Sequence, residues 1–130
     1  MFKRKSDNNA SSSRSFDSLI GNKTMFEGNI NCEGSIRIDG KINGDIKAHE
    51  DILISETAHV TGNIQGNNVH ISGRVDGNVY SGTLIRLYSS ACLHGDIEAV
   101  SFVTEEGAYF NGQCKMLESS HVQVPSDNSV

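Results

Sequence analysis

Three cysteines and five histidines are the residues of this 130-residue chain best suited to act as nucleophiles, general bases or metal ligands. The cysteines are Cys32, Cys92 and Cys114. They form no CxxC pair, so neither a zinc site nor a disulfide framework is indicated. The histidines of the middle region are His49, His59, His70 and His94. None follows a metal-binding spacing such as HExxH, and we predict that they lie on a solvated surface.

Adjacent acidic residues are the remaining candidates for acid–base chemistry. They occur as Glu50-Asp51 and Glu105-Glu106. Neighbouring side chains on a strand or turn point apart, whereas acid–base catalysis requires two carboxyl groups that face each other across the substrate. We therefore predict no catalytic residue, no metal site and no cofactor, and a chain that is not an enzyme.

A five-residue pattern of apolar, polar, Gly, polar and apolar residues determines where all these side chains lie. Its six copies span residues 26–30, 42–46, 60–64, 75–79, 93–97 and 110–114. Successive glycines are 16, 18, 15, 18 and 17 residues apart, which is too regular for chance and too short for a helical repeat. A second, shorter alternation lies between the copies, at residues 36–38, 52–54, 69–71 and 85–87.

Two or three short strands in a repeat of about 17 residues are typical of one coil of a parallel β-helix. We therefore expect an all-β, single-domain solenoid of about six rungs that rises roughly 29 Å at ~4.8 Å per rung. A low aromatic content of 6% suits a narrow interior. A β-sandwich is the alternative, but hairpins do not explain the constant register of the repeat.

Two details of the repeat are open at this point. The central glycine marks either an interior too narrow for a Cβ or a bend in the strand. The residue after it belongs to an amide-rich column, for which we predict hydrogen bonds along the coil axis. That column is Asn29, Asp45, Asn63, Asn78, Asp96 and Gln113.

The run GSIRIDGKINGDI at residues 34–46, the repeated Gly-Asn/Asp-Ile/Val element and the short polar tails resemble the bactofilins, small polymer-forming bacterial cytoskeletal proteins. The resemblance covers about residues 19–117. It implies a right-handed β-helix that polymerises end to end without nucleotide, lies at the inner face of the membrane and scaffolds cell-shape or envelope proteins. The handedness follows from the resemblance alone.

The two ends of the chain, residues 1–18 and 118–130, lack apolar periodicity and are expected to be disordered around a domain at 19–117. The net charge is +3 over residues 1–24, −6 over residues 25–117 and −2 over residues 118–130. A basic tail on an acidic body predicts contact between the tail and an anionic membrane. The predicted contact residues are Met1, Phe2, Lys3, Arg4 and Lys5.

Two other roles are open for this tail. Nucleic acid is disfavoured as a partner, because three basic residues give a small phosphate footprint and the acidic body repels a duplex. The tail is otherwise a solvated segment without a partner. No apolar run approaches the ~18 residues of a membrane span, and no secretory signal is present, so we expect a cytoplasmic protein peripheral to the membrane.

The terminal rungs carry apolar residues where monomeric solenoids carry polar caps. The predicted polymerisation interface is Met25 and Phe26 at one end and Phe102 and Phe110 at the other. The predicted function is that of a self-assembling filament subunit. One alternative is a hexapeptide acyltransferase with a left-handed coil, whose strict six-residue register the observed spacings break. The other is a monomeric β-helix that binds a partner.

Overall fold

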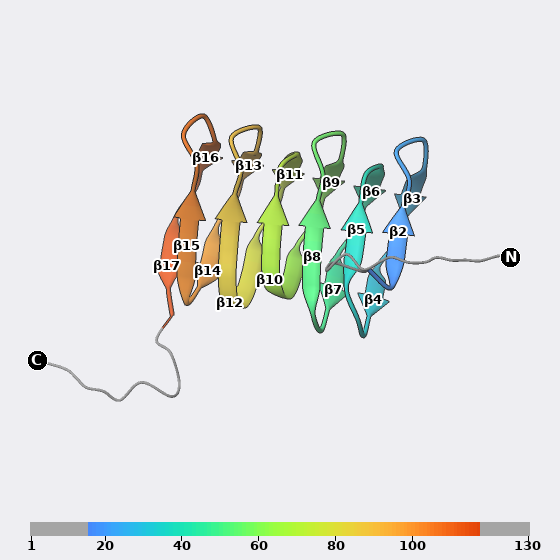
Figure 1. The fold of residues 1–130 in the computed structure, drawn as a ribbon, viewed down its shortest axis with the longest axis horizontal. Coiled ribbons are helices and arrows are strands. Elements are labelled where there is room, and N and C mark those ends of the chain that lie inside the picture. The colour runs from blue at the N-terminus through green and yellow to red at the C-terminus, as the bar shows by residue number, and fades with distance from the viewer. Residues whose placement is uncertain (1–15, 118–130) are drawn as a thin grey trace, which may run out of the picture.

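The structure is a computed structural model that describes residues 16–117, and this part of the chain contains sixteen short strands and no helix. All strand pairs are parallel and join successive turns of one coil. The coil has three flat faces. The predicted all-β solenoid is confirmed, with three strand segments in each turn, because two of the sixteen strands contribute a segment to each of two turns (Figure 1).

The three faces each contain one strand segment from every turn. Face 1 consists of β2 (Ser18–Ile20), β5 (Ile36–Ile38), β8 (Asp51–Ile54), the second parts of β10 (Ile64–Ile71) and β12 (Val79–Leu87), and β15 (Ser101–Thr104). Face 2 consists of β3 (Met25–Glu27), β6 (Lys41–Asn43), β9 (His59–Thr61), β11 (Arg74–Asp76), β13 (Cys92–His94) and β16 (Tyr109–Asn111). Face 3 consists of β4 (Ile30–Cys32), β7 (Ile46–Ala48), the first parts of β10 and β12, β14 (Ile97–Ala99) and β17 (Cys114–Met116).

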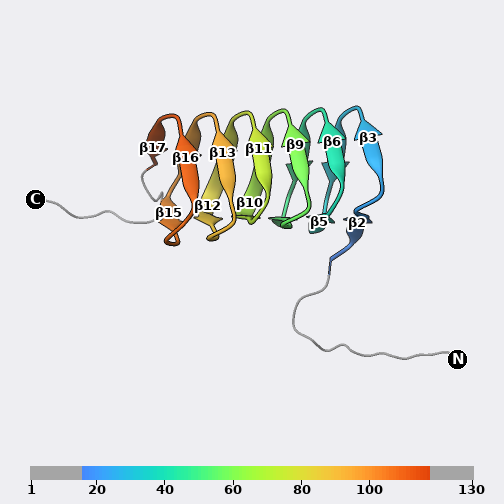
Figure 2. The same cartoon turned by 90° about the horizontal axis from the view of Figure 1, so that it is seen from above.

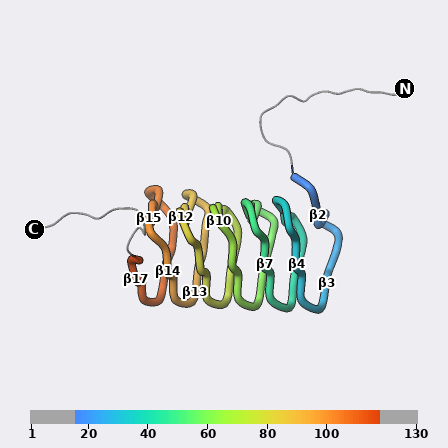
Figure 3. The backbone as a smooth tube through the Cα atoms, turned by 90° about the horizontal axis from the view of Figure 1, so that it is seen from below, coloured from blue at the N-terminus to red at the C-terminus, as the bar shows by residue number. Residues whose placement is uncertain are grey.

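The coil makes six turns and is right-handed. In Figure 1 the strands of face 1 run upward on the near side, and the chain then passes over the top to the far side while it advances from right to left. Figure 2 shows the strands of face 2 side by side along the top, and Figure 3 shows the stacked turns from below. A right-handed crossover between parallel strands is the rule for twisted strands.

The core consists of columns of aliphatic side chains that stack along the axis. On face 2 the column is Ile42, Val60, Val75 and Leu93, each at most 2% exposed. Full burial of one such side chain stabilises the fold by about 1.5–3 kcal/mol. In the described residues the core-facing aromatic side chains, Phe26, Phe102 and Phe110, belong to the terminal turns, whereas the core of the inner turns is aliphatic.

The glycine of the repeat lies at the corner between faces 2 and 3, so the pattern forms two strands and not one. Gly44, Gly62, Gly77 and Gly95 have φ angles between +145° and +150°. A Cβ built on any of these four would lie 1.9–2.1 Å from the carbonyl oxygen of the repeat glycine one turn earlier. The strand bends at glycine, and the bend brings the backbones of adjacent turns too close for a side chain.

The amide-rich column does hydrogen-bond along the axis, but its acceptors bind backbone and not other amides. The Oδ1 atom of Asn29 accepts the backbone N–H of Asp45 at 3.1 Å. The same bond recurs four times at 2.9–3.1 Å. The Oδ1 atoms of Asp45, Asn63, Asn78 and Asp96 accept the backbone N–H groups of Asn63, Asn78, Asp96 and Gln113, respectively. Asn and Asp both carry the Oδ1 acceptor that this bond requires.

The ladder gives a first prediction. We expect Asn63→Ala to lower the free energy of unfolding by about 1 kcal/mol, because the Asn78 N–H loses its protein acceptor at a partly exposed corner. Gln113→Ala is the matched control, since no turn follows it in residues 16–117, and it should change stability by less than about 0.5 kcal/mol. Urea unfolding measures both changes in stability, in chains that also carry Phe110→Arg to prevent assembly. Equal effects would contradict a role for the ladder.

The corner between faces 1 and 2 has two lengths, and the longer one separates the repeat spacings of 17 and 18 residues from those of 15 and 16. In turns 1, 3, 5 and 6 it is a four-residue β-turn closed by a bond from the fourth N–H to the first carbonyl, at 2.9–3.1 Å. These projecting turns are residues 21–24, 55–58, 88–91 and 105–108. In turns 2 and 4 only Asp39-Gly40 and Ser72-Gly73 separate the strands. Figure 1 shows the four taller loops and the two lower corners along the upper edge.

Candidate functional site

Exposed apolar side chains gather at the two ends of the coil. The most exposed large apolar residues of the described chain are Leu19 (62%), Met25 (66%), Val103 (41%), Tyr109 (49%) and Met116 (53%). All five belong to strands of the first or the last turn. Within residues 16–117, each inner turn is covered on both sides, whereas each terminal turn has a neighbouring turn on one side only. The two ends are therefore the candidate assembly surfaces.

The first turn presents its core-facing side chains to solvent at the N-terminal end. Phe26, Ile20, Ile30 and Cys32 pack against the core and are only partly buried. Met25 lies beside Phe26 on β3 but points away from the core, so it borders this end on face 2. The first turn already begins with Ser18 of β2, which pairs with Ile36 of the second turn.

The last turn presents a more aromatic surface. Phe102 of β15 and Phe110 of β16 lie with ring centroids 5.6 Å apart and one ring edge against the other ring's face. Such an arrangement adds a favourable quadrupole interaction to the burial of the two rings. Cys114 continues the core-facing column of Ile97 but is exposed, since no described turn covers it. Partial burial raises the pKa of its thiol.

The structure thus brings Phe102 and Phe110 together and places Phe26 at the opposite end. The predicted interface did not include Ile20, Ile30, Ala108 or Met116, which the structure places on the same two surfaces. Their signal was available in the repeat register, because each aligns with a buried core position in the adjacent turn. An example is Ile20, which pairs with the fully buried Ile38.

The backbone edges of the terminal turns also face outward. In inner turns the N–H of the repeat glycine donates to a carbonyl of the following turn, as Gly95 does to Asn111 at 3.0 Å. Gly112 holds the same position in the last turn, and no further turn of the described chain offers it an acceptor. Each end therefore combines unpaired strand edges with apolar surface, which favours the addition of another strand layer.

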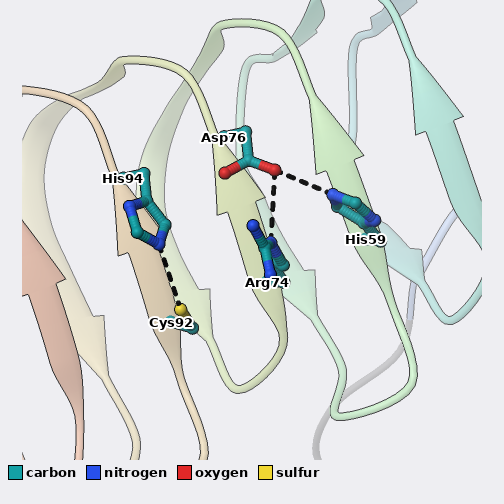
Figure 4. Close-up of polar contacts among 5 residues, drawn as sticks. All are labelled: His59, Arg74, Asp76, Cys92 and His94. Atoms are coloured by element: carbon teal, nitrogen blue, oxygen red, sulfur yellow. Dashed lines mark hydrogen bonds and ion pairs between the residues drawn. The ribbon is translucent and has the colours of Figure 1, made fainter.

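A polar cluster on face 2 is the part of the described surface most similar to a chemical site (Figure 4). The Oδ2 atom of Asp76 lies 2.9 Å from His59 Nε2 and 3.2 Å from Arg74 Nε. The hydrogen bond from His59, together with the bond and charge of Arg74, lowers the pKa of Asp76 despite its partial burial. The contacts with His59 and Arg74 stabilise the ionised carboxylate, which leaves it poorly suited to accept a proton.

The neighbouring thiol and imidazole of this cluster form a separate pair. Cys92 Sγ and His94 Nε2 are 3.6 Å apart on adjacent outward positions of β13. No third His, Cys, Asp or Glu of residues 16–117 completes a group that could hold a metal ion. The hollow on this face is lined by Met25, Lys41, His59 and Thr61 and does not include the pair.

The residues predicted for membrane contact, Met1, Phe2, Lys3, Arg4 and Lys5, lie outside the described residues, as does the C-terminal segment 118–130. Within residues 16–117, no helix has the length and apolarity needed to cross a bilayer.

Comparison with known proteins agrees with the geometry of the coil and its open ends. Residues 18–115 match the model of a family described as "Bactofilin: Polymer-forming cytoskeletal". The chain is also 29% identical over 100 residues to Bactofilin BacO of Myxococcus xanthus (strain DK1622), an alignment that covers 77% of this chain and 79% of that protein. No solved structure gives a significant match. The chain belongs to the bactofilin family of polymer-forming cytoskeletal proteins.

Proposed function

We propose that this protein is a filament subunit that assembles end to end through its first and last turns, without nucleotide, and supports cell-shape or envelope proteins at the inner face of the membrane. The observation that carries the proposal is the confinement of the exposed large apolar side chains to the two terminal turns. Membership of a polymer-forming, cytoskeletal family supports the same reading and favours a structural role over catalysis.

End-to-end contact is favoured because it buries both kinds of exposed group together. A second copy on the last turn would cover the Phe102–Phe110 pair and would pair the strand edges of β15, β16 and β17. Each end is then covered by an end of a second copy of this chain, whether like or unlike ends meet. None of these contacts involves a phosphate-binding loop, so assembly should need no nucleotide.

The corresponding prediction is assembly of the purified full chain alone. At micromolar concentration, negative-stain microscopy should show filaments, and their amount by high-speed sedimentation should be the same with ATP, with GTP and with neither. The absence of filaments under all three conditions would refute the proposed function. Filaments that required a nucleotide would refute the proposed mechanism of assembly.

Membrane association would depend on the N-terminal tail and on assembly jointly. Each basic residue near an anionic leaflet contributes about 1 kcal/mol, and full burial of Phe2 about 1.5–3 kcal/mol, so one tail binds weakly. A filament presents many tails on one scaffold, and after the first contact the others bind at high effective concentration. Because part of the attraction is electrostatic, binding should weaken with salt.

Co-sedimentation with anionic liposomes tests this part. We expect wild type to bind, and a variant without residues 2–5 to form filaments that do not bind. An assembly-deficient variant with an intact tail should bind at least about tenfold more weakly than wild type, since it lacks multivalency. Equal binding by all three proteins would contradict the proposed role of the tail.

A further inference from the structure

A groove of about 430 Å³ crosses the outer side of the coil where face 3 meets face 1. It extends over β7, β10 and β12 and is bordered by Leu117, the last described residue. In Figure 3, β17 lies at the left end of the coil beside β14, and β7 lies further right. We call this hollow the face-3 groove, and its lining includes Lys47, His49, Gln65, Tyr80, Gly82 and Leu117.

We propose that the face-3 groove holds residues 118–130 of the same chain, which fold back along the coil over β12, β10 and β7. Such docking takes place within one chain and needs no end-to-end assembly. The occupied groove is closed to other ligands. A protein that binds this part of face 3 must therefore displace the C-terminal segment first.

The segment is long enough for this path. Strands β17, β14, β12, β10 and β7 are successive neighbours, so Leu117 and Lys47 are four strand spacings apart, or about 19 Å. An extended chain covers this distance in about six residues at ~3.3 Å per residue. Residues 118–130 therefore reach Lys47, and Val122 and Val124 fall within the groove.

The sequence after Leu117 does not continue the coil. The Leu117 N–H donates to the Ala99 carbonyl at 2.7 Å, and β17 pairs Cys114 with Ile97, an offset of 17 residues. The same offset places Ser119 opposite Phe102, whose ring packs against the core. A serine adds no apolar surface to this column, and its hydroxyl would need a partner there. The chain is therefore free to leave the coil, and the groove lies beside its exit.

The charge of the segment suits the groove. Among the described residues that line the groove, Lys47 and His49 are exposed and none is acidic. The segment carries Glu118 and Asp127 and no Lys or Arg. Since the net charge of residues 25–117 is −6, a groove with a basic and neutral lining is a favoured place for an acidic segment.

Two valines supply the apolar contact. Val122 and Val124 point to the same side of an extended chain, and Pro125 favours that conformation because it disfavours the α region for the residue before it. On the groove side, Tyr80 is half-buried and offers its ring. Gly82 is exposed, with nothing within 4 Å of an added Cβ, so the corner leaves room for a branched side chain.

The groove is formed before the segment enters it. The Thr83 hydroxyl donates to Asn67 Oδ1 at 2.7 Å, and the Thr83 N–H donates to Ser81 Oγ at 3.0 Å, which fixes β12 against β10. A fixed groove loses little conformational entropy when it is occupied. Because the segment is tethered at Leu117, its effective concentration is about millimolar, and a weak contact is sufficient.

Acrylamide quenching of a single tryptophan tests the docking, because the chain has no Trp of its own. Tyr80→Trp in the full chain places the indole in the groove. Val122→Asn/Val124→Asn should raise the quenching constant of this indole at least about twofold, since the segment then leaves the groove. Ser129→Asn/Val130→Asn is the matched control, because both positions lie beyond the stretch that spans the groove, and it should leave the constant unchanged.

A probe on the segment gives a second measurement. The indole of Val122→Trp should be quenched at least about twofold less than that of Ser129→Trp, and Gly82→Glu should remove this difference because it fills the groove with a carboxylate. Ser89→Glu adds the same charge at an exposed position of the projecting turn 88–91 and should leave the difference intact.

Dilution distinguishes the two sources of such a segment. The protection should persist on dilution and in chains that also carry Phe110→Arg, as expected for a segment of the same chain. Protection that is lost in either case would assign the groove to the C-terminal segment of a second copy and would overturn the proposal. Equal quenching of Val122→Trp and Ser129→Trp, or a Tyr80→Trp constant that both tail variants leave unchanged, would overturn it as well.

Discussion

Phe110→Arg should abolish filament assembly while the chain still folds. Phe110 faces the core from the last turn and contacts Phe102, and it lies at the end where another subunit would cover it. In a joint the guanidinium would be buried without a partner, at a cost of about 3–5 kcal/mol, whereas at a free end it reaches water. Such a cost raises the critical concentration for assembly by about 100-fold or more.

The neighbouring residue provides the control for this substitution. Asn111 lies on the same strand, points outward from face 2 and is exposed. Asn111→Arg adds the same charge to the same turn but leaves it in water, so filaments should form. High-speed sedimentation, size-exclusion chromatography and circular dichroism separate assembly from folding. Normal filaments of Phe110→Arg would show that Phe110 does not lie at the joint, and an unfolded Phe110→Arg chain would contradict the prediction that the variant folds.

Gly77→Ala should prevent stable folding. Gly77 has φ +149°, and an added Cβ would lie 1.9 Å from the carbonyl oxygen of Gly62 in the preceding turn. Neither backbone can move without breaking a hydrogen bond to the next turn. The Gly77 N–H donates to the His94 carbonyl at 2.8 Å, and the Gly62 N–H donates to the Asp76 carbonyl at 2.9 Å. We expect a loss of about 4 kcal/mol or more, which is the range of severe core defects.

Two other glycines resolve the cause of this loss. Gly28 shares the unusual conformation, with φ +129°, but an added Cβ would only touch the Phe26 ring at 3.6 Å. Gly28→Ala should therefore cost only the backbone strain of about 1–3 kcal/mol. Gly82 has nothing within 4 Å of an added Cβ, and Gly82→Ala should be neutral or stabilise by up to about 1 kcal/mol. Thermal unfolding in the assembly-deficient background measures the series, and equal losses at Gly77 and Gly82 would exclude the proposed clash.

The amino-acid sequence by itself determined the solenoid, the number of turns and the core. Apolar residues recur at the same register in every turn, because stacked parallel strands place equivalent residues directly above one another. That register also identified Phe26, Phe102 and Phe110 as the ends of core columns. The polar column after each glycine was identified as an axial ladder for the same reason.

Tertiary structure decided what depends on the approach of one turn to the next. The third face was hidden in the sequence because each glycine bends the chain within an unbroken alternating pattern, and only the nearby Gly62 carbonyl explains why Gly77 must be glycine. The ladder acceptors bind backbone N–H groups, which no residue pattern reveals. The structure also separates Met25 from Phe26: the two residues alternate on β3, so Phe26 faces the core and Met25 is exposed on face 2.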